Sequence, residues 1–433
     1  MFTAIHRNTM SPARRRRTVV TAALGLCVFT APALARADDP VLEWNDIARR
    51  LIVVPALAPV QQTRAMAIVH VAVHDAVNSI TREYEPYLSI GSAPAGVSPE
   101  AAAIAAAYQS LRGLFGDSDF LSTAYATSLA AHGISPVDSG LGFGQSVAEG
   151  ILALRQQDGA ALAAFPYLPP DVGLVGVWAP ISSAPSAQAL LPGWGNVTPW
   201  VLRSGSQFRP DPPPALDSER YATDYNEVVQ LGAAVNSMRT DEQTQIALFW
   251  RASPTAVWNP ILRKAVQSRG LDLSATARVM GLFYLAAADA SVACWEAKYV
   301  YNYWRPQPAI ANGDADGNDA TAADPAWRPL VPTPPHPEYP SAHTANSGAM
   351  AHVLKSIFGD APGFAIEATS SQNVGFVRLW QTFGEGVEEV IDARVYSGIH
   401  FRTADEVGAR LGRQVAKFVL KHALRPEKKR GKR

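Results

Sequence analysis

The 433-residue chain is poor in cysteine, because Cys27 and Cys294 are its only two. Cys27 lies in an N-terminal segment that we expect to be removed, so the mature chain has no pair with which to form an internal disulfide and must depend on its core. Cys294 lies in an apolar helical run, which favours a buried, inert thiol over a reactive one.

Several motifs of common enzyme classes are also missing. The chain has no GxxxxGK[ST] loop and no strand-linked GxGxxG, which argues against nucleotide chemistry. It has no GxSxG elbow and no HExxH pair either. No uncharged apolar run reaches the roughly 18 residues that a membrane-spanning helix needs, so we expect a soluble mature protein without a membrane span.

Basic residues are concentrated at the two ends of the chain. The totals balance, with 38 basic and 38 acidic residues, but the first 37 residues contain six arginines and no acid. Without them the count is 32 basic against 38 acidic residues. A nucleic-acid partner would have only the tail 425–433 to bind, and such a tail is more typical of a disordered, solvated end, so we expect no nucleic-acid partner.

Residues 1–37 have the pattern of a secretory signal peptide. The arginine run Arg14–Arg17 precedes an apolar stretch, Val19–Phe29, and the small-residue site Ala35–Ala37 follows. The pattern predicts cleavage before Asp38 and export to the periplasm or the medium. The paired arginines also resemble a twin-arginine signal, so the export route, Sec or Tat, stays open.

The rest of the chain has helical hydrophobic spacing and predicts an all-α protein built of helical bundles. We expect an N-terminal helical region at 38–240 that contains a proline-rich irregular segment at 165–216. A helical core at 241–424, a C-terminal bundle, carries the candidate site, and a basic disordered tail follows at 425–433. No alternating strand pattern of note is present. Helices are expected at 218–233, 241–250, 273–304, 344–358, 372–393 and 404–424.

Three clusters in the last third of the chain carry the side chains that point to chemistry. The first is Lys298 with Arg305, followed by Pro306. Seven residues are nearly two helical turns, so the two cations are expected on one helical face, with Pro306 ending the helix. An ammonium and a guanidinium together make an anion clamp. Two solvated surface charges are the alternative, which the four aromatic residues between them disfavour.

The second cluster is the segment Pro335–His343, which leads into a helix. Ser341 can cap that helix, and the first-turn amides with the hydroxyl point at any anion bound at the helix N-terminus. His343 is placed to exchange protons with such an anion, although a capping or core histidine is the alternative. The third cluster is Arg394–Arg402, where Gly398 permits a sharp turn, Arg394 adds a third cation and His400 offers a neutral nitrogen as ligand or nucleophile.

In this order and spacing, the clusters resemble the superfamily of vanadium-dependent haloperoxidases and type 2 phosphatidic-acid phosphatases. Its pattern is K-x6-R-P, then P-S-G-H, then S-R-x5-H-x3-D. The bacterial soluble haloperoxidase-like branch is the most similar, since the upstream stretches Arg64–Asn78, Phe249-Trp250, Trp258-Asn259 and Trp295–Lys298 also look like it.

The resemblance implies a role for each matched residue. Lys298, Arg305 and Arg394 would neutralise the equatorial oxygens of vanadate or phosphate, with help from Ser341 and the Ala342 amide. His400 would bond the metal or phosphorus apically, and His343 would act as acid and base at the opposite side. The cofactor would be vanadate, and the partners would be hydrogen peroxide, a halide and a small organic acceptor. An oligomer of identical chains is possible, but no motif indicates one.

The chain departs from the pattern at three positions. Ala342 replaces the motif glycine, which would restrict the backbone if a positive φ were required. Ala393 replaces the serine before Arg394. Ala404 occupies the place of the final acid, which is displaced to Asp405.

The residues expected to line a halide or substrate pocket give mixed indications. Trp295 resembles the chloroperoxidase branch, whereas His336 occupies the place of a histidine in algal bromoperoxidases. We expect bromide to be preferred to chloride.

Two other functions remain open. A periplasmic acid phosphatase could use the same residues on a phosphomonoester through a phosphohistidine at His400, with phosphate in place of vanadate. A non-catalytic oxyanion-binding protein is the other alternative.

His70 and His74 share a helical face and could bind a metal, but without a third ligand a packed or hydrogen-bonded role is favoured.

Overall fold

The fold was analysed in a computed structural model, which describes residues 39–52, 57–182, 184 and 188–427. The expected signal peptide and residues 428–433 of the basic tail lie outside these ranges. Within them the chain forms thirteen α-helices and one two-stranded hairpin, so the prediction of an all-α fold is confirmed.

The α-helices are α1 Pro40–Ile52, α2 Pro59–Thr81, α3 Pro99–Phe115, α4 Asp119–Ala131, α5 Ser139–Gln156, α6 Glu219–Leu231, α7 Asp241–Phe249, α8 Pro254–Arg269, α9 Leu273–Tyr301, α10 Pro306–Ala311, α11 Ala342–Phe358, α12 Phe383–Tyr396 and α13 Arg402–His422. Single 3-10 turns lie at η1 Ala160–Leu162, η3 Trp194–Asn196, η4 Gly205–Phe208 and η5 Gly313–Ala315, and the strands are β1 Ile366–Ala368 and β2 Arg378–Trp380.

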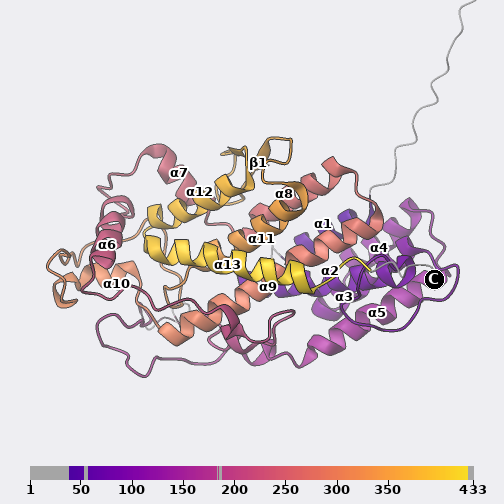
Figure 1. Ribbon diagram of the computed structural model, residues 1–433, viewed down its shortest axis with the longest axis horizontal. Coiled ribbons are helices and arrows are strands. Elements are labelled where there is room, and N and C mark those ends of the chain that lie inside the picture. The colour runs from indigo at the N-terminus through magenta and orange to yellow at the C-terminus, as the bar shows by residue number, and fades with distance from the viewer. Residues whose placement is uncertain (1–38, 53–56, 183, 185–187, 428–433) are drawn as a thin grey trace, which may run out of the picture. The chain divides into compact units, whose positions relative to one another are not determined.

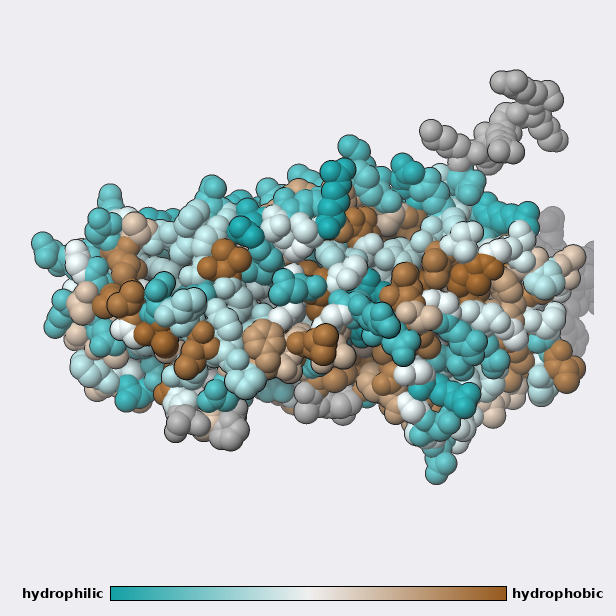
Figure 2. Space-filling view, turned by 90° about the horizontal axis from the view of Figure 1, so that it is seen from below, coloured by the Kyte–Doolittle hydropathy of each residue, from teal (hydrophilic) through white to brown (hydrophobic). Residues whose placement is uncertain are grey.

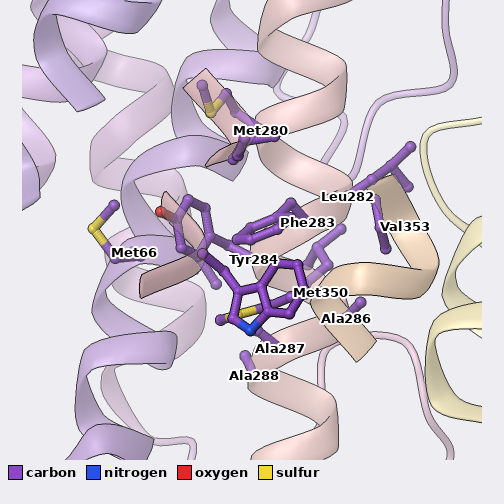
Figure 3. Packing of buried hydrophobic residues seen from close by; sticks show 14 of the residues in the cluster. Met66, Met280, Leu282, Phe283, Tyr284, Ala286, Ala287, Ala288, Met350 and Val353 are labelled. Carbon is purple, nitrogen blue, oxygen red and sulfur yellow. The ribbon is translucent and has the colours of Figure 1, made fainter. Parts of the chain in front are cut away.

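The long helix α9 is the centre of the fold. Helices α1 to α5 gather around its N-terminal half, and α6 and α10 lie near its other end, with α11 and α13 alongside it (Figure 1). Asp272 caps α9 by accepting the Ala275 amide. In length and hydropathy α9 could cross a membrane, but 94% of its apolar window is buried inside the protein. Its residues Phe283 and Tyr284 lie between Met66 of α2 and Val353 of α11 (Figure 3).

Glycines let α11 and α13 pack at very short range. A β-carbon at Gly412 would lie 2.0 Å from the carbonyl oxygen of Ala345, and one at Gly408 would lie 2.4 Å from the carbonyl oxygen of Ser341. Since real β-carbons do not approach backbone this closely, the two helices need glycine at these crossings. This packing fixes the start of α11 against the start of α13, where the candidate site lies.

The described part of the proline-rich segment at 165–216 contains only the short 3-10 turns η3 and η4, and polar side chains of α9 hold it. Asp289, fully buried in the middle of α9, accepts the backbone amides of Trp200, Val201 and Leu202 at 2.6, 2.8 and 2.9 Å. Further along α9, Tyr299 donates from its hydroxyl to the Leu190 carbonyl at 2.8 Å. A segment that cannot form helix is thus ordered by polar groups on its neighbour.

The expected helix at 372–393 is wrong in its first half. Residues 366–380 form the hairpin of β1 and β2, which pairs Ile366 with Trp380, and α12 begins only at Phe383. Trp380 stacks on Trp250, with ring centroids 5.9 Å apart, and the burial of this aromatic pair outweighs local helix propensity.

On the face shown in Figure 2, hydrophobic residues lie in several separate patches among hydrophilic ones.

Candidate active site

The three clusters found in the sequence come together in space. The C-terminal end of α9, the segment before α11 and the turn between α12 and α13 meet, and their charged side chains are buried. Cys294, one turn before Lys298, is buried with a free thiol, and burial raises the pKa of that thiol to about 11. It is therefore inert, as expected.

Lys298 lies in the last turn of α9 with its ammonium fully buried. Nζ donates to the carbonyl oxygens of Pro337 and Glu338 at 2.8 and 2.9 Å, so one of its three N–H groups is left for another acceptor. Burial, together with the positive charge of Arg305, lowers the pKa of Lys298 to about 7. An anion nearby would favour its charged form.

Arg305 does not share a helical face with Lys298, so that expectation is wrong. Helix α9 ends at Tyr301, because Asn302 has a left-handed backbone with φ 46°, and Arg305 is extended, with φ −84° and ψ 158°. Pro306 begins α10; it does not end α9. The two cations therefore reach the site from different elements.

The Arg305 guanidinium is fully buried and holds both neighbouring histidine segments. Nε donates to the His336 carbonyl at 2.9 Å and Nη2 to His336 Nδ1 at 3.0 Å. Nη1 donates to the Ile399 carbonyl at 2.7 Å and to His400 Nε2 at 3.1 Å. Four of its five N–H groups are used in this way, which locks its position.

Arg394 supplies the third cation from the last turn of α12. Nη1 donates to the Trp250 carbonyl at 2.9 Å, while the buried Nε has no hydrogen-bond partner within the part of the chain that the structure describes. Burial lowers the pKa of Arg394 to about 10, and the Asp405 carboxylate opposes this shift. The guanidinium stays charged at neutral pH and keeps most of its donors available.

Ser341 precedes α11 and is the N-cap residue by position, but its side chain makes no capping bond. Among the described residues its buried Oγ has no hydrogen-bond partner of normal geometry, although it is close enough to Asp405 to lower the pKa of that carboxyl. Ala342 is the first residue of α11 and has no positive φ, so alanine fits where the motif has glycine. Its amide, like the others in the first turn, has no intrahelical acceptor.

The two histidines expected to take part in catalysis come from different elements: His343 from α11, and His400 from the turn between α12 and α13. His343, in the first turn of α11, lies with Nε2 3.2 Å from the Ala252 carbonyl, so Nε2 carries the proton and Nδ1 is free to accept one. Burial and the charge of Arg394 keep its pKa well below 6.5. His400 follows the turn at Gly398, φ 76°, and its pKa is also held well below 6.5 by burial and by the nearby cations.

Two buried carboxyl groups belong to the site and were not assigned to it from the sequence. Glu338 Oε1 accepts from His400 Nδ1 at 2.9 Å and from the Phe401 amide at 2.9 Å. Asp405 faces Ser341 and Arg394. Burial raises the pKa of Glu338 to about 8, while Arg305 and Lys298 oppose that shift. Glu338 lies within the second cluster and Asp405 is the displaced acid of the motif, but nothing in the sequence marks their partners.

Trp295 and His336 lie side by side at the edge of the site. Their ring centroids are 4.9 Å apart with an interplanar angle of 41°. The Trp295 indole donates to the Leu190 carbonyl at 3.2 Å, so the proline-rich segment holds it in place. Burial, with the charges of Arg305 and Lys298, keeps the pKa of His336 well below 6.5 and the ring neutral.

The donors left over in the site fit an oxyanion. One N–H of Lys298, the remaining N–H groups of Arg394, the Ser341 hydroxyl and the Ala342 amide have no acceptor among the described residues. Buried donors without a partner each cost about 1–3 kcal/mol, so such a set is rare unless a ligand completes it. A vanadate or phosphate ion supplies several acceptor oxygens, and three cations offset its charge.

The pair His70 and His74 lies apart from this site, in the packed core. The ring of His70 stacks on Tyr284 at 5.0 Å, and its Nε2 accepts from Asn45 Nδ2 at 2.9 Å. Burial lowers the pKa of His70 to about 3 and that of His74 to about 4. Across the described ranges, no group of three or more His, Cys, Asp or Glu side chains could hold a metal ion.

Comparison with known proteins adds independent findings. Residues 278–428 match a family model described as the VCPO second helical-bundle domain. A 212-residue alignment is 24% identical to vanadium chloroperoxidase from Curvularia inaequalis and covers 41% of this chain, but only 34% of that protein's length. The crystal structure of a bacterial vanadium-dependent iodoperoxidase has a TM-score of 0.79 at 27% identity, covering 90% of this chain and 98% of the other. The holo form of a bacterial vanadium-dependent chloroperoxidase shares the fold, with a TM-score of 0.68 at 18% identity over 85% of this chain and 92% of the other.

Proposed function

The chain belongs to the superfamily of vanadium-dependent haloperoxidases and type 2 phosphatidic-acid phosphatases, and we propose that it is a vanadium-dependent haloperoxidase. In this proposal it oxidises a halide with hydrogen peroxide, and the hypohalous product halogenates a small organic acceptor. The observation that supports the proposal best is a set of buried hydrogen-bond donors that have no acceptor of normal geometry among the described residues. Ser341 Oγ and Arg394 Nε are the main ones, and they lie among the buried cations of the site.

Bound vanadate would supply a Lewis-acidic centre that activates hydrogen peroxide for two-electron oxidation of the halide. Lys298, Arg305 and Arg394 would offset its negative charge, and Ser341 and the Ala342 amide would donate to its oxygens. His400 would offer Nε2 to the metal in exchange for its contact with Arg305 Nη1.

His343 is the residue that moves protons in this proposal. Its ring is neutral because of burial and the charge of Arg394, and Nδ1 is its unprotonated nitrogen. It can take a proton from hydrogen peroxide and return it to the oxygen that leaves as water. The sum of the reaction is halide, hydrogen peroxide and one proton giving hypohalous acid and water.

We propose bromide as the preferred halide over chloride, with Trp295 and His336 lining the halide and substrate pocket. The support is the pairing of these two rings beside Arg305, which gives a weakly polar, partly aromatic wall. Iodide, which is easier to oxidise than bromide, should also react. Relative rates with the three halides at equal concentration test this preference.

The first experiment is a paired assay on the mature chain from Asp38, stripped of metal and phosphate. Bromination with hydrogen peroxide and hydrolysis of p-nitrophenyl phosphate are each measured with and without vanadate, for the wild type and for His400→Ala. Bromination that requires both vanadate and His400 supports the proposal. Hydrolysis inhibited by vanadate, with no bromination, makes the protein a phosphatase. Oxyanion binding with neither activity makes it a binding protein.

Export to the periplasm or the medium stays a prediction, which we retain as part of the proposal. N-terminal sequencing of the protein from fractionated cells tests it, because cleavage before Asp38 is expected. Light scattering on the purified chain decides whether it forms an oligomer.

A further inference from the structure

We propose that Glu338 is the positioning residue of His400, and that it supplies the carboxylate that the chain lacks at position 404. Its carboxyl group fixes the imidazole with the proton on Nδ1 and the lone pair of Nε2 directed at the oxyanion. The inference rests on the proposed function, since it concerns how strongly His400 can bond vanadate. The evidence for it is the hydrogen bonding between Glu338 and His400. In addition, neither Ala404 nor Asp405 provides a carboxylate that contacts the His400 ring.

The protonation of the His400 ring follows from its two partners. Arg305 Nη1, which can only donate, lies 3.1 Å from Nε2, so Nε2 must be the unprotonated nitrogen. Nδ1 therefore carries the proton of the neutral ring, and it donates to Glu338 Oε1 at 2.9 Å. A carboxylate behind a ligating histidine fixes the ring orientation and raises its strength as a ligand.

Glu338 is itself held by several elements. Its amide donates to the Tyr303 carbonyl at 2.9 Å, and its carbonyl accepts from Lys298 Nζ at 2.9 Å. Oε1 also accepts the amide of Phe401, the residue after His400, at 2.9 Å. The side chain is fully buried. It therefore joins the end of α9 to the His400 segment and cannot swing away from the ring.

The two other candidates for this role fail on position. Ala404 occupies the place of the motif acid and carries no carboxylate; with Glu338 it borders a cavity of only about 10 Å³. Asp405, the next residue, faces Ser341 and Arg394, and neither of its carboxyl oxygens is hydrogen-bonded to His400. Glu338, 62 residues away in the sequence, is the acid that contacts the ring.

This role has a consequence that separates two oxyanions. A bound vanadate ion would accept Nε2 as a ligand, whereas a phosphate ion at rest would be held only by charges and hydrogen bonds. The carboxylate strengthens the first interaction, but its negative charge opposes both anions. Removing that charge should therefore weaken vanadate binding and leave phosphate binding unchanged or tighter.

The test is Glu338→Gln in the mature full chain, with dissociation constants for vanadate and for inorganic phosphate measured by calorimetry at one pH above 8, where the wild-type Glu338 carboxyl group is charged. The glutamine oxygen can still accept the Phe401 amide, so the fold is kept. We expect vanadate to bind about 10–100-fold more weakly while phosphate binds no more weakly than in the wild type. Equal weakening of both or no change in either leaves the ratio of the constants as in the wild type and overturns the proposal, and so does any tightening of vanadate binding.

The matched control is Asp224→Asn. Asp224 is a buried carboxyl that borders the same small cavity and accepts the Thr403 amide at 3.0 Å, but it does not contact His400. Loss of the Asp224 charge should leave the ratio of the vanadate and phosphate dissociation constants unchanged. If the wild type itself binds vanadate no more tightly than phosphate and does not brominate, the proposed function fails, which is a different outcome from an unchanged ratio in the variant.

A second measurement does not depend on any variant at position 338. In the ligand-free wild type labelled with nitrogen-15 histidine, the His400 ring, assigned through its loss in His400→Ala, should show a downfield proton on Nδ1 and an unprotonated Nε2. A proton on Nε2 would refute the proposal, because the lone pair would then face Glu338.

Discussion

The replacement of Asp289 by asparagine should destabilise the protein strongly, although the side chain keeps its size and lies outside the candidate site. Asp289 Oδ1 accepts the Trp200 amide, and Oδ2 accepts those of Val201 and Leu202. Both oxygens are acceptors, so the group acts as a carboxylate. In Asp289→Asn one oxygen becomes an NH₂ group, which faces an amide donor.

The magnitude follows from these bonds. If the remaining oxygen still accepts the amides of Val201 and Leu202, the Trp200 amide is left buried without a partner, at a cost of about 1–3 kcal/mol. The two bonds that remain change from charged to neutral and lose about 1 kcal/mol each. Relief from burying a charge offsets part of this sum. We therefore expect the free energy of unfolding to fall by about 3 kcal/mol.

Urea unfolding of the mature chain, followed by circular dichroism, measures this loss. The control is Asp272→Asn at the exposed start of the same helix, where asparagine caps as well as aspartate and the change should stay below about 0.5 kcal/mol. If Asp289→Asn costs less than about 1 kcal/mol, the three amides do not depend on the carboxylate, and the account of how the proline-rich segment is held is wrong.

Three further predictions concern other parts of the molecule. Ala342→Gly should change activity little, because position 342 begins a helix and needs no positive φ; a large gain in turnover would count against this. Gly412→Ala should cost about 1–3 kcal/mol in urea unfolding, since its β-carbon would meet the Ala345 carbonyl at 2.0 Å, and unchanged stability would contradict the close packing. His70 has a pKa of about 3 when folded and 6.5 when unfolded, so its contribution to stability is complete above pH 6.5 and is lost as the pH falls towards 3. Between pH 7 and pH 5 the wild type should lose about 2 kcal/mol more than His70→Gln, and equal losses would show that His70 is not held neutral.

The sequence predicts the features that depend on local pattern. Helix α9 follows from its long apolar run. The three clusters are found from their residue types and from the resemblance of their order to a known family, so Lys298, Ser341 and His400 are named without a structure. The roles of these residues stay predictions. Ala342 is a case in which the sequence raises a doubt that local geometry answers, because the backbone at the start of α11 is helical.

What the sequence cannot give depends on residues far apart in the chain. The side of the site from which Arg305 enters is set by the left-handed Asn302 and by the break between α9 and α10. The hairpin at 366–380 forms because Trp380 finds Trp250 across the fold. Glu338 becomes a partner of His400 only when α13 packs on α11, a contact that no local motif encodes.

The composition of the site explains why it is costly to build and useful once built. Three cations and two carboxyl groups are buried together, and the bonds of Lys298 and Arg305 to carbonyl oxygens offset much of their desolvation. The Ser341 hydroxyl and Arg394 Nε have no hydrogen-bond partner of normal geometry in the described part of the chain, and each such donor costs up to about 1–3 kcal/mol. An oxyanion that binds only the folded state returns this energy, because at one hundred times its dissociation constant it adds about 2.7 kcal/mol to stability. The same donors that weaken the fold would therefore strengthen the binding of the proposed oxyanion.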